Sequence, residues 1–222
     1  MSQLILHELS HSPFCIPVRR ILEAYGRPYQ RVAVPAWDRR GLALLTGGAY
    51  YQVPVLEDGA RIVHETPEDP LAVARYLDAE VAGGCLFPEH CAGLQELVIG
   101  HIEDTLEGLG FRLSDPGHVD AIEDLGERVM VIRHKERKLG VGCVERWREE
   151  APQLAAAFEA ALAPYELRLG HSDFLFGGEP VYADYALFGV LGNAQGNGDY
   201  TLGENFVHLK RWEQRIGTFA AV

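Results

Sequence analysis

The sequence predicts a protein in two parts, an α/β domain followed by an all-helical domain. From residue 4 to about 80, short apolar runs alternate with helical stretches. Beyond residue 90 the strand pattern disappears, and apolar residues recur at spacings of three and four. We therefore predict domains at residues 1–80 and 91–222, joined by a linker at 81–90 that contains Gly83-Gly84 and Pro88.

The apolar runs and helical stretches of the first part predict the element order βαβ-α-ββα. A βαβ unit opens it, because two apolar runs flank a helical stretch. A second helix precedes Gly47-Gly48, and Glu57-Asp58-Gly59 is typical of a hairpin turn between two short strands. The predicted strands are 4–9, 29–34, 53–56 and 61–63, and the predicted helices are 15–26, 37–45 and 71–77.

The apolar spacing in the second part predicts helices only. Leu94, Leu97 and Val98 begin an apolar series with helical spacing that continues to Leu109. Pro164 is expected to kink or split the helix that contains it. The further predicted helices are about 119–138, 141–150, 152–169, 182–193 and 205–216.

Composition excludes several classes of protein. With 47% apolar and 23% charged residues the chain is an ordinary globular one. Its formal charge of -12 would repel phosphate backbones, so nucleic acid is not an expected partner. No apolar run reaches about 18 residues, so no membrane span is expected. Four scattered cysteines predict reduced thiols and a cytoplasmic location.

Ser12-Pro13-Phe14-Cys15 lies at a predicted strand-to-helix junction. The first N–H groups of a helix lack partners and carry partial positive charge, which favours a thiolate. Serine holds the leading place of what would otherwise be a C-x-x-C pair, so the protein cannot form that disulfide. The reactive sulfur is then expected to arrive with a ligand. Ser12 as a plain helix cap is the alternative, and Ser10 and His11 are alternative hydrogen-bond donors.

Val53-Pro54 lies at the start of a predicted strand, where a proline is tolerated. A cis bond there would turn the preceding backbone outward. Val53 could then offer its N–H and C=O to an extended peptide, which would bind as an added strand.

The element order, together with three segments, resembles the cytosolic glutathione transferases. The segments are Ser12-Pro13-Phe14-Cys15 with Arg19, Gln52-Val53-Pro54-Val55-Leu56, and Tyr182-Ala183-Asp184-Tyr185-Ala186-Leu187-Phe188. The resemblance covers nearly the whole chain. It implies a thioredoxin-like glutathione-binding domain before the helical one, glutathione as co-substrate, no metal, and a homodimer. It also reverses the general preference for a trans bond at Pro54.

The resemblance also implies roles for individual residues. Ser12 would donate a hydrogen bond to the glutathione thiolate, as in the serine-type tau- and omega-like classes. Gln52, Val53 and Pro54 would hold the peptide. Phe14, Phe111 and Tyr165 are the candidates for the second-substrate pocket.

The γ-glutamyl end of glutathione would bind at Glu65-Thr66. The sequence departs from the family pattern here, because Glu65 lies eleven positions before Tyr76 whereas Asp69 lies at the usual seven. The four additional residues correspond to about one helical turn, so Glu65-Thr66 is favoured and Asp69 stays an alternative.

Other candidates receive structural interpretations. Val181 replaces the hydroxyl residue that normally caps the helix three positions before Asp184, so that carboxylate must be held in another way. Cys85, His90 and Cys91 match no zinc pattern, and we expect them to be linker residues.

The leading hypothesis is an enzyme that activates the glutathione thiol for attack on a small hydrophobic electrophile. Two alternatives stay open: a noncatalytic binding or regulatory protein of the same fold, and a glutathione-dependent thiol reductase that uses Cys15.

Overall fold

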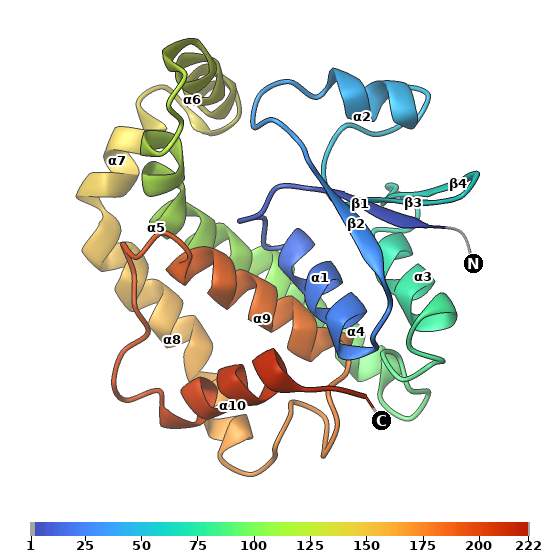
Figure 1. Cartoon of the computed structure of the whole chain (residues 1–222). Coiled ribbons are helices and arrows are strands. Elements are labelled where there is room, and N and C mark those ends of the chain that lie inside the picture. Colours follow the sequence, from blue (N-terminus) through green and yellow to red (C-terminus); the bar gives the residue numbers. More distant parts are fainter. Residues whose placement is uncertain (1–2, 222) are drawn as a thin grey trace.

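The computed structural model describes residues 3–221, and the ends of the two predicted domains at residues 1–2 and 222 lie outside this range. A four-stranded sheet and the helices that cover it form the first part, and helices form the remainder (Figure 1). The predicted fold class is confirmed. The predicted linker at residues 81–90 falls between α3 and α4, outside any helix or strand, and the division into two domains stays a prediction.

The sheet has the strand order β2-β1-β3-β4, with β1 parallel to β2 and antiparallel to β3. Leu4 and Leu6 of β1 and Leu56 of β3 are fully buried, and they hold the sheet against its helices. The strands are β1 (Leu4–Glu8), β2 (Tyr29–Ala33), β3 (Val55–Asp58) and β4 (Arg61–Val63), and the helices of this part are α1 (Cys15–Ala24), α2 (Arg40–Leu45) and α3 (Ala72–Glu80).

The second part packs around α9, most of whose residues are buried. Its elements are α4 (Ala92–His101), the π-helix η1 (Ile102–Leu106), α5 (Glu107–Asp120), α6 (Leu125–Leu139), α7 (Cys143–Glu149), α8 (Ala151–Leu169), α9 (Tyr182–Gln195) and α10 (Val207–Thr218). No helix within residues 3–221 is long and apolar enough to cross a membrane.

Several predicted boundaries were wrong. The expected single stretch at 94–109 is α4, η1 and the start of α5, and α5 continues through Pro116 to Asp120. Pro164 does not split α8: it and Ala160 are exposed, so water can solvate the carbonyl that proline leaves unpaired. β3 begins after Pro54 and not at residue 53.

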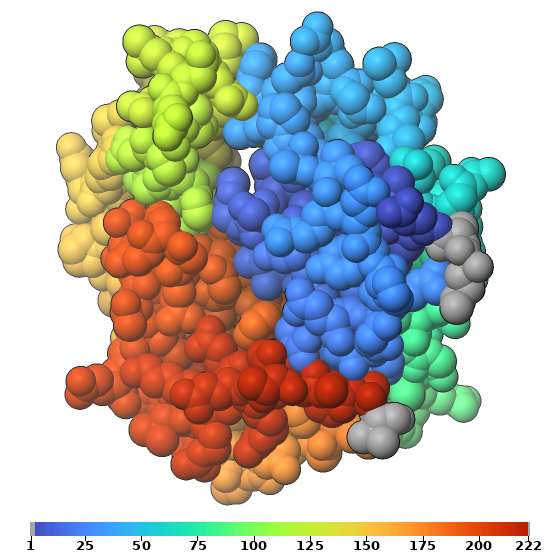
Figure 2. Space-filling view, viewed as in Figure 1, coloured from blue at the N-terminus to red at the C-terminus, as the bar shows by residue number. Residues whose placement is uncertain are grey.

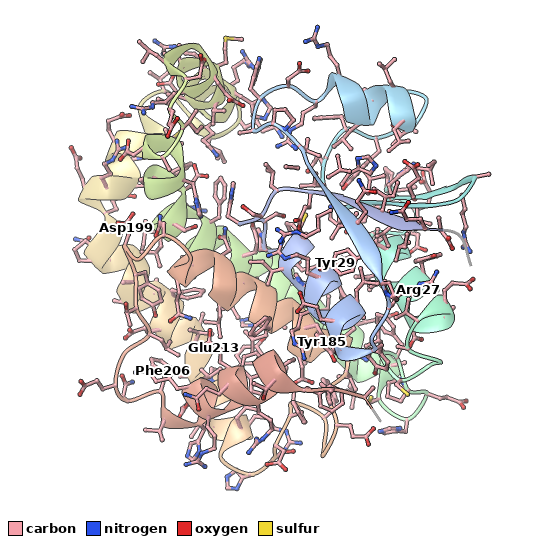
Figure 3. The ribbon with its side chains drawn as sticks, in the orientation of Figure 1. Arg27, Tyr29, Tyr185, Asp199, Phe206 and Glu213 are labelled. Carbon is pink, nitrogen blue, oxygen red and sulfur yellow. The ribbon has the colours of Figure 1, made fainter. Side chains whose placement is uncertain are left out.

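The two parts meet where α1 packs against α9, as Figure 1 shows. The C-terminal segment adds to this contact, because Arg20 of α1 donates a hydrogen bond to the Ile216 carbonyl at 2.8 Å. Figure 3 labels Tyr185 on α9 and Glu213 on α10, and Gln195 of α9 donates a hydrogen bond to Glu213 at 2.9 Å. These contacts fix the helical part relative to the loop that precedes α1.

Asp184 holds the start of α9 without a hydroxyl cap. Its carboxylate accepts hydrogen bonds from the backbone N–H groups of Leu175 at 2.9 Å and Val181 at 3.1 Å, and from Trp212 Nε1 at 2.8 Å. Burial nevertheless raises the pKa of Asp184 to about 6. The backbone carbonyl of Val181 accepts the N–H of Asp184 in place of the missing side chain.

Candidate functional site

Ser12 lies in the turn between β1 and α1 and is only 6% exposed. Its carbonyl accepts the N–H groups of Cys15 and Ile16, and its hydroxyl oxygen accepts the N–H of Phe14 at 3.3 Å. Ser12 therefore does cap the turn that begins α1, while its side chain also lines a cavity. A cap and a ligand contact are compatible, since a hydroxyl that accepts one hydrogen bond still has its own proton to donate.

Cys15 is fully buried, and burial raises the pKa of its thiol to about 12. A hydrogen bond with Ser12 acts in the opposite direction but does not outweigh burial. The thiol is therefore protonated at neutral pH, and a protonated thiol is a poor nucleophile.

The Val53–Pro54 peptide bond is cis, as the resemblance implies. Val53 and Gln52 line the same cavity as Ser12. Within residues 3–221, the backbone N–H and C=O of Val53 have no hydrogen-bond partner. The backbone thus presents a free donor and a free acceptor beside Ser12, as strand addition requires.

Glu65 follows β4 and is mostly buried, with the Tyr50 hydroxyl donating a hydrogen bond to it at 3.2 Å. Burial raises the pKa of Glu65 to about 7. No cation pairs with Glu65 in the described part of the chain. Asp69, the alternative, already forms an ion pair with Arg75. Glu65 is therefore the carboxylate that has no cation of its own.

Thr66 fixes the turn between β4 and α3. Its hydroxyl oxygen accepts the N–H of Asp69 at 3.0 Å, and the two residues also exchange backbone hydrogen bonds. The additional residues before α3 form this turn, and α3 begins only at Ala72.

Glu103 is a residue that sequence reasoning missed. It lies in η1 and is largely buried, and burial together with the nearby charge of Glu65 raises its pKa to about 7. Two carboxylates from the two parts of the chain thus lie close together. π-Helical turns often occur at functional sites, but the sequence does not reveal this one because its apolar spacing is that of an ordinary helix.

A cavity of about 470 Å³ opens between the two parts of the chain. Figure 2 shows the hollow between α6, the segment that precedes α2, and the loop that contains Ser12. Trp37 closes part of it, because its backbone N–H donates a hydrogen bond to Glu127 of α6 at 3.1 Å. The aromatic residues that line the cavity are Phe14, Trp37, Tyr51 and Phe111.

The structure brings some of the predicted residues to this cavity and not others. Ser12, Gln52, Val53, Phe14 and Phe111 line it. Tyr165 of α8 does not, because it stacks beside His101 of α4 with its hydroxyl 2.8 Å from His101 Nδ1. Pro54, Glu65 and Thr66 lie outside its lining.

His11 and Ser10, the alternative hydrogen-bond donors, differ in whether they line this cavity. His11 lines this cavity, stacked on His118 with ring centroids 4.1 Å apart, and burial lowers the pKa of His11 to about 4. Ser10 lines a different hollow, to which His11 and Asp199 also contribute.

No cluster of three or more potential metal ligands occurs within residues 3–221. Cys85 is exposed and Cys91 is buried, with the Cys91 thiol 3.6 Å from the Pro88 carbonyl. The segment between the two parts therefore offers no assembled metal site among the described residues.

Comparison with known proteins agrees with this geometry. Residues 6–83 match the family description "Glutathione S-transferase, N-terminal domain", and residues 130–215 match "Glutathione S-transferase, C-terminal domain". The chain belongs to the cytosolic glutathione S-transferase superfamily. No curated protein matches it.

Solved structures share the fold at low sequence identity. Glutathione transferase GSTFuA3 from Phanerochaete chrysosporium is 18% identical, with a TM-score of 0.81 over 100% of this chain and 99% of that one. CsGST63524 from Ceriporiopsis subvermispora, solved in complex with glutathione, is 16% identical, with a TM-score of 0.78 over 99% and 98%. FzlA from C. crescentus is 17% identical, with a TM-score of 0.72 over 98% and 90%. These likenesses show the fold, and the membership in a serine-type or tau- or omega-like class stays a prediction.

Proposed function

We propose that the protein is a glutathione transferase in which Ser12 activates the thiol of glutathione. The observation that carries this proposal is the lining of one cavity by the Ser12 hydroxyl and by the unpaired backbone of Val53. A glutathione peptide paired with Val53 would bring its cysteine toward Ser12. The complex of CsGST63524 with glutathione supports glutathione as the ligand of this fold.

The charged ends of glutathione have counterparts near this cavity. Glu65 and Glu103 lack a cation and suit the α-ammonium of the γ-glutamyl residue. Arg39 lines the cavity, and its Nη1 is buried without a hydrogen-bond partner, so it suits the glycyl carboxylate. Thr66 holds the turn that positions Glu65.

The reaction follows from this arrangement. The Ser12 hydroxyl donates a hydrogen bond to the thiolate, which lowers the thiol pKa, and the thiol proton leaves to solvent. The thiolate sulfur then forms a bond to an electrophilic carbon of the second substrate. Either a leaving group departs with the electron pair of the bond that breaks, or the π pair of a double bond moves to the neighbouring atom, which takes a proton from solvent. Phe14 and Phe111 line the space for this substrate.

One titration tests the proposal. Glutathione is added to the wild type and to Ser12→Ala and Ser12→Thr, and thiolate absorbance in the ultraviolet is followed with pH. A hydrogen bond to a charged group is worth about 1.5–3 kcal/mol, so the thiol pKa in Ser12→Ala is expected to rise by about 1–2 units, while Ser12→Thr keeps the lower value. Absence of glutathione binding overturns the transferase proposal, and an unchanged pKa in Ser12→Ala overturns the role of Ser12.

The alternatives gain less support. A reductase would depend on Cys15, whose burial and raised pKa disfavour attack on a disulfide. The noncatalytic alternative rested on the missing cap at Val181 and on the turn after Thr66. Asp184 nevertheless accepts three hydrogen bonds, and the Thr66 hydroxyl accepts one that closes its turn. A cytoplasmic location stays a prediction from composition.

A homodimer is part of the proposal. Leu94 and Leu97 of α4 are 64% and 73% exposed, and they lie on one face because they are three residues apart. Adjacent exposed leucines are typical of an interaction surface. A second copy of the chain is the proposed occupant, since a two-fold axis would pack this face against itself.

A further inference from the structure

The lining of the cavity carries several charged side chains. Lys135 and Lys138 of α6 lie there with Glu107 and Asp115 of α5, and Arg39 faces them from the segment before α2. The chain as a whole has a charge of -12, so a cavity with three cations and two carboxylates differs from the remaining surface.

Lys135 is already neutralised. Its ammonium forms an ion pair with Asp115 at 2.7 Å and lies 4.7 Å from the centroid of the Phe111 ring. Both groups of this pair are largely buried, so it fixes α6 on α5 and leaves no charge for a ligand.

Lys138 is the cavity-lining lysine whose ammonium has no partner in the described residues. It lies one turn beyond His134 on the same face of α6, and it forms no ion pair or hydrogen bond within residues 3–221. Burial and the neighbouring cations lower the pKa of His134, so that ring is neutral at physiological pH and able to share in a hydrogen bond.

No carboxylate within residues 3–221 forms an ion pair with Lys138. Glu107 has no hydrogen-bond partner in the described chain, and burial together with Asp115 raises its pKa. The charges that act on Glu107 are those of Asp115, Arg112 and Lys135, and the carboxylate whose charge acts on Arg39 is Glu127. Since Arg39 suits the glycyl carboxylate of glutathione, Lys138 has no counter-ion when glutathione is bound.

We infer that the second substrate is an aromatic or other planar electrophile that carries an anionic group, and that Lys138 binds this group. Its apolar part would pack on Phe14, Trp37 and Phe111, and its anionic group would lie at the mouth of the cavity. This inference rests on the proposed function and names the substrate class for the same site.

The test uses two glutathione conjugates that differ only in charge, S-(4-carboxybenzyl)glutathione and S-(4-carbamoylbenzyl)glutathione. Calorimetry measures the dissociation constant of each, and glutathione alone is titrated in parallel. An exposed ion pair accounts for up to about fivefold in affinity, so the carboxylate is expected to bind about fivefold more tightly than the amide. Lys138→Gln is expected to remove this preference, and Lys138→Glu to reverse it.

Arg133→Gln is the matched control. Arg133 lies on the same helix, carries the same charge and does not line the cavity, so this variant keeps the preference for the carboxylate. Equal binding of the two conjugates to the wild type, or an unchanged preference in Lys138→Gln, overturns the inference. If the protein binds glutathione but neither conjugate, the inference is overturned and the proposed function is not. Absence of glutathione binding overturns the proposed function and the inference with it.

Discussion

Ser12 and Cys15 are three residues apart, but their surroundings give them opposite chemistry. Ser12 lines the cavity with its hydroxyl, whereas Cys15 is fully buried and has a pKa of about 12. The sequence alone suggested this difference through the missing cysteine at position 12. Burial supplies the physical reason, since it penalises the thiolate more than the hydrogen bonds with Ser12 and the Leu9 backbone favour it.

Cys15→Ala is expected to leave transferase activity within about twofold of the wild type, because a protonated thiol does no chemistry. Iodoacetamide labelling followed by mass spectrometry checks the same point. Cys85, the exposed cysteine, is expected to react first, and Cys15 only after unfolding. Rapid labelling of Cys15 in the folded protein, or loss of activity in Cys15→Ala, would favour the reductase.

Glu65 makes stability depend on pH. Its folded pKa of about 7 lies above the ordinary value of 4.5, so the folded state holds the proton more tightly than the unfolded state. This contribution to stability is complete below pH 4.5 and is lost as pH rises through 7. For this group alone the loss amounts to about 3 kcal/mol.

Glu65→Gln is therefore expected to unfold at higher urea concentration than the wild type at pH 8 and at a similar one at pH 4.5. The same variant is expected to bind glutathione at least tenfold more weakly, because it lacks the charge that faces the ammonium. Glu68→Gln, at an exposed position, is the control for both measurements. Tighter glutathione binding by Glu65→Gln would contradict the assignment of this carboxylate.

At the scale of elements, α9 positions the loop that contains Ser12. A Cβ atom on Gly189 would lie 2.1 Å from the Pro13 carbonyl oxygen and 2.6 Å from Pro17 Cγ, so only glycine allows this approach. One turn further, Asn193 donates a hydrogen bond to the His11 carbonyl at 2.7 Å and accepts one from Ser114 at 3.0 Å. The helical domain thus fixes the backbone on both sides of Ser12.

Gly189→Ala is expected to displace this loop, since backbone atoms cannot yield as a flexible side chain does. Overpacking of this kind costs about 1–3 kcal/mol, and kcat/KM is expected to fall about tenfold or more. Gly192→Ala is the matched control, because its Cβ would meet only the Ile16 side chain at 3.3 Å. Urea unfolding and steady-state kinetics measure both effects, and equal behaviour of the two variants would contradict the role of Gly189.

The helices and strands also show which elements the sequence patterns could predict and which they could not. The number and order of the strands, and α1, were predicted well because short apolar runs and helical spacing alternate clearly in this part, although β3 lies two residues later than expected. The predicted helix at 119–138 merged the end of α5 with α6, since Val131 is the one buried residue of α6 and gives little apolar periodicity. Asp124 sets the true start of α6 by accepting the N–H of Glu127 at 2.6 Å.

At the scale of the whole molecule, the site divides into a part that the sequence could predict and a part that it could not. Ser12, Gln52 and Val53 belong to local motifs of one domain, and the structure places them on one cavity. Arg39 and Lys138 line that cavity, and Glu103 approaches Glu65, only through packing between distant segments. Tyr165, chosen for its aromatic ring, instead packs beside His101.

The outward face of α4 leads to a prediction about assembly. Leu94 and Leu97 expose most of their apolar surface, and a dimer axis through this face would bring each pair close to its copy. The double substitution Leu94→Glu with Leu97→Glu would place four carboxylates together, so sedimentation velocity is expected to show a dimer for the wild type and a monomer for this variant. Leu167→Glu is the control, because Leu167 is 72% exposed on α8 and lies outside this face. A monomeric wild type, or a double variant that stays dimeric, would show that α4 does not form the interface.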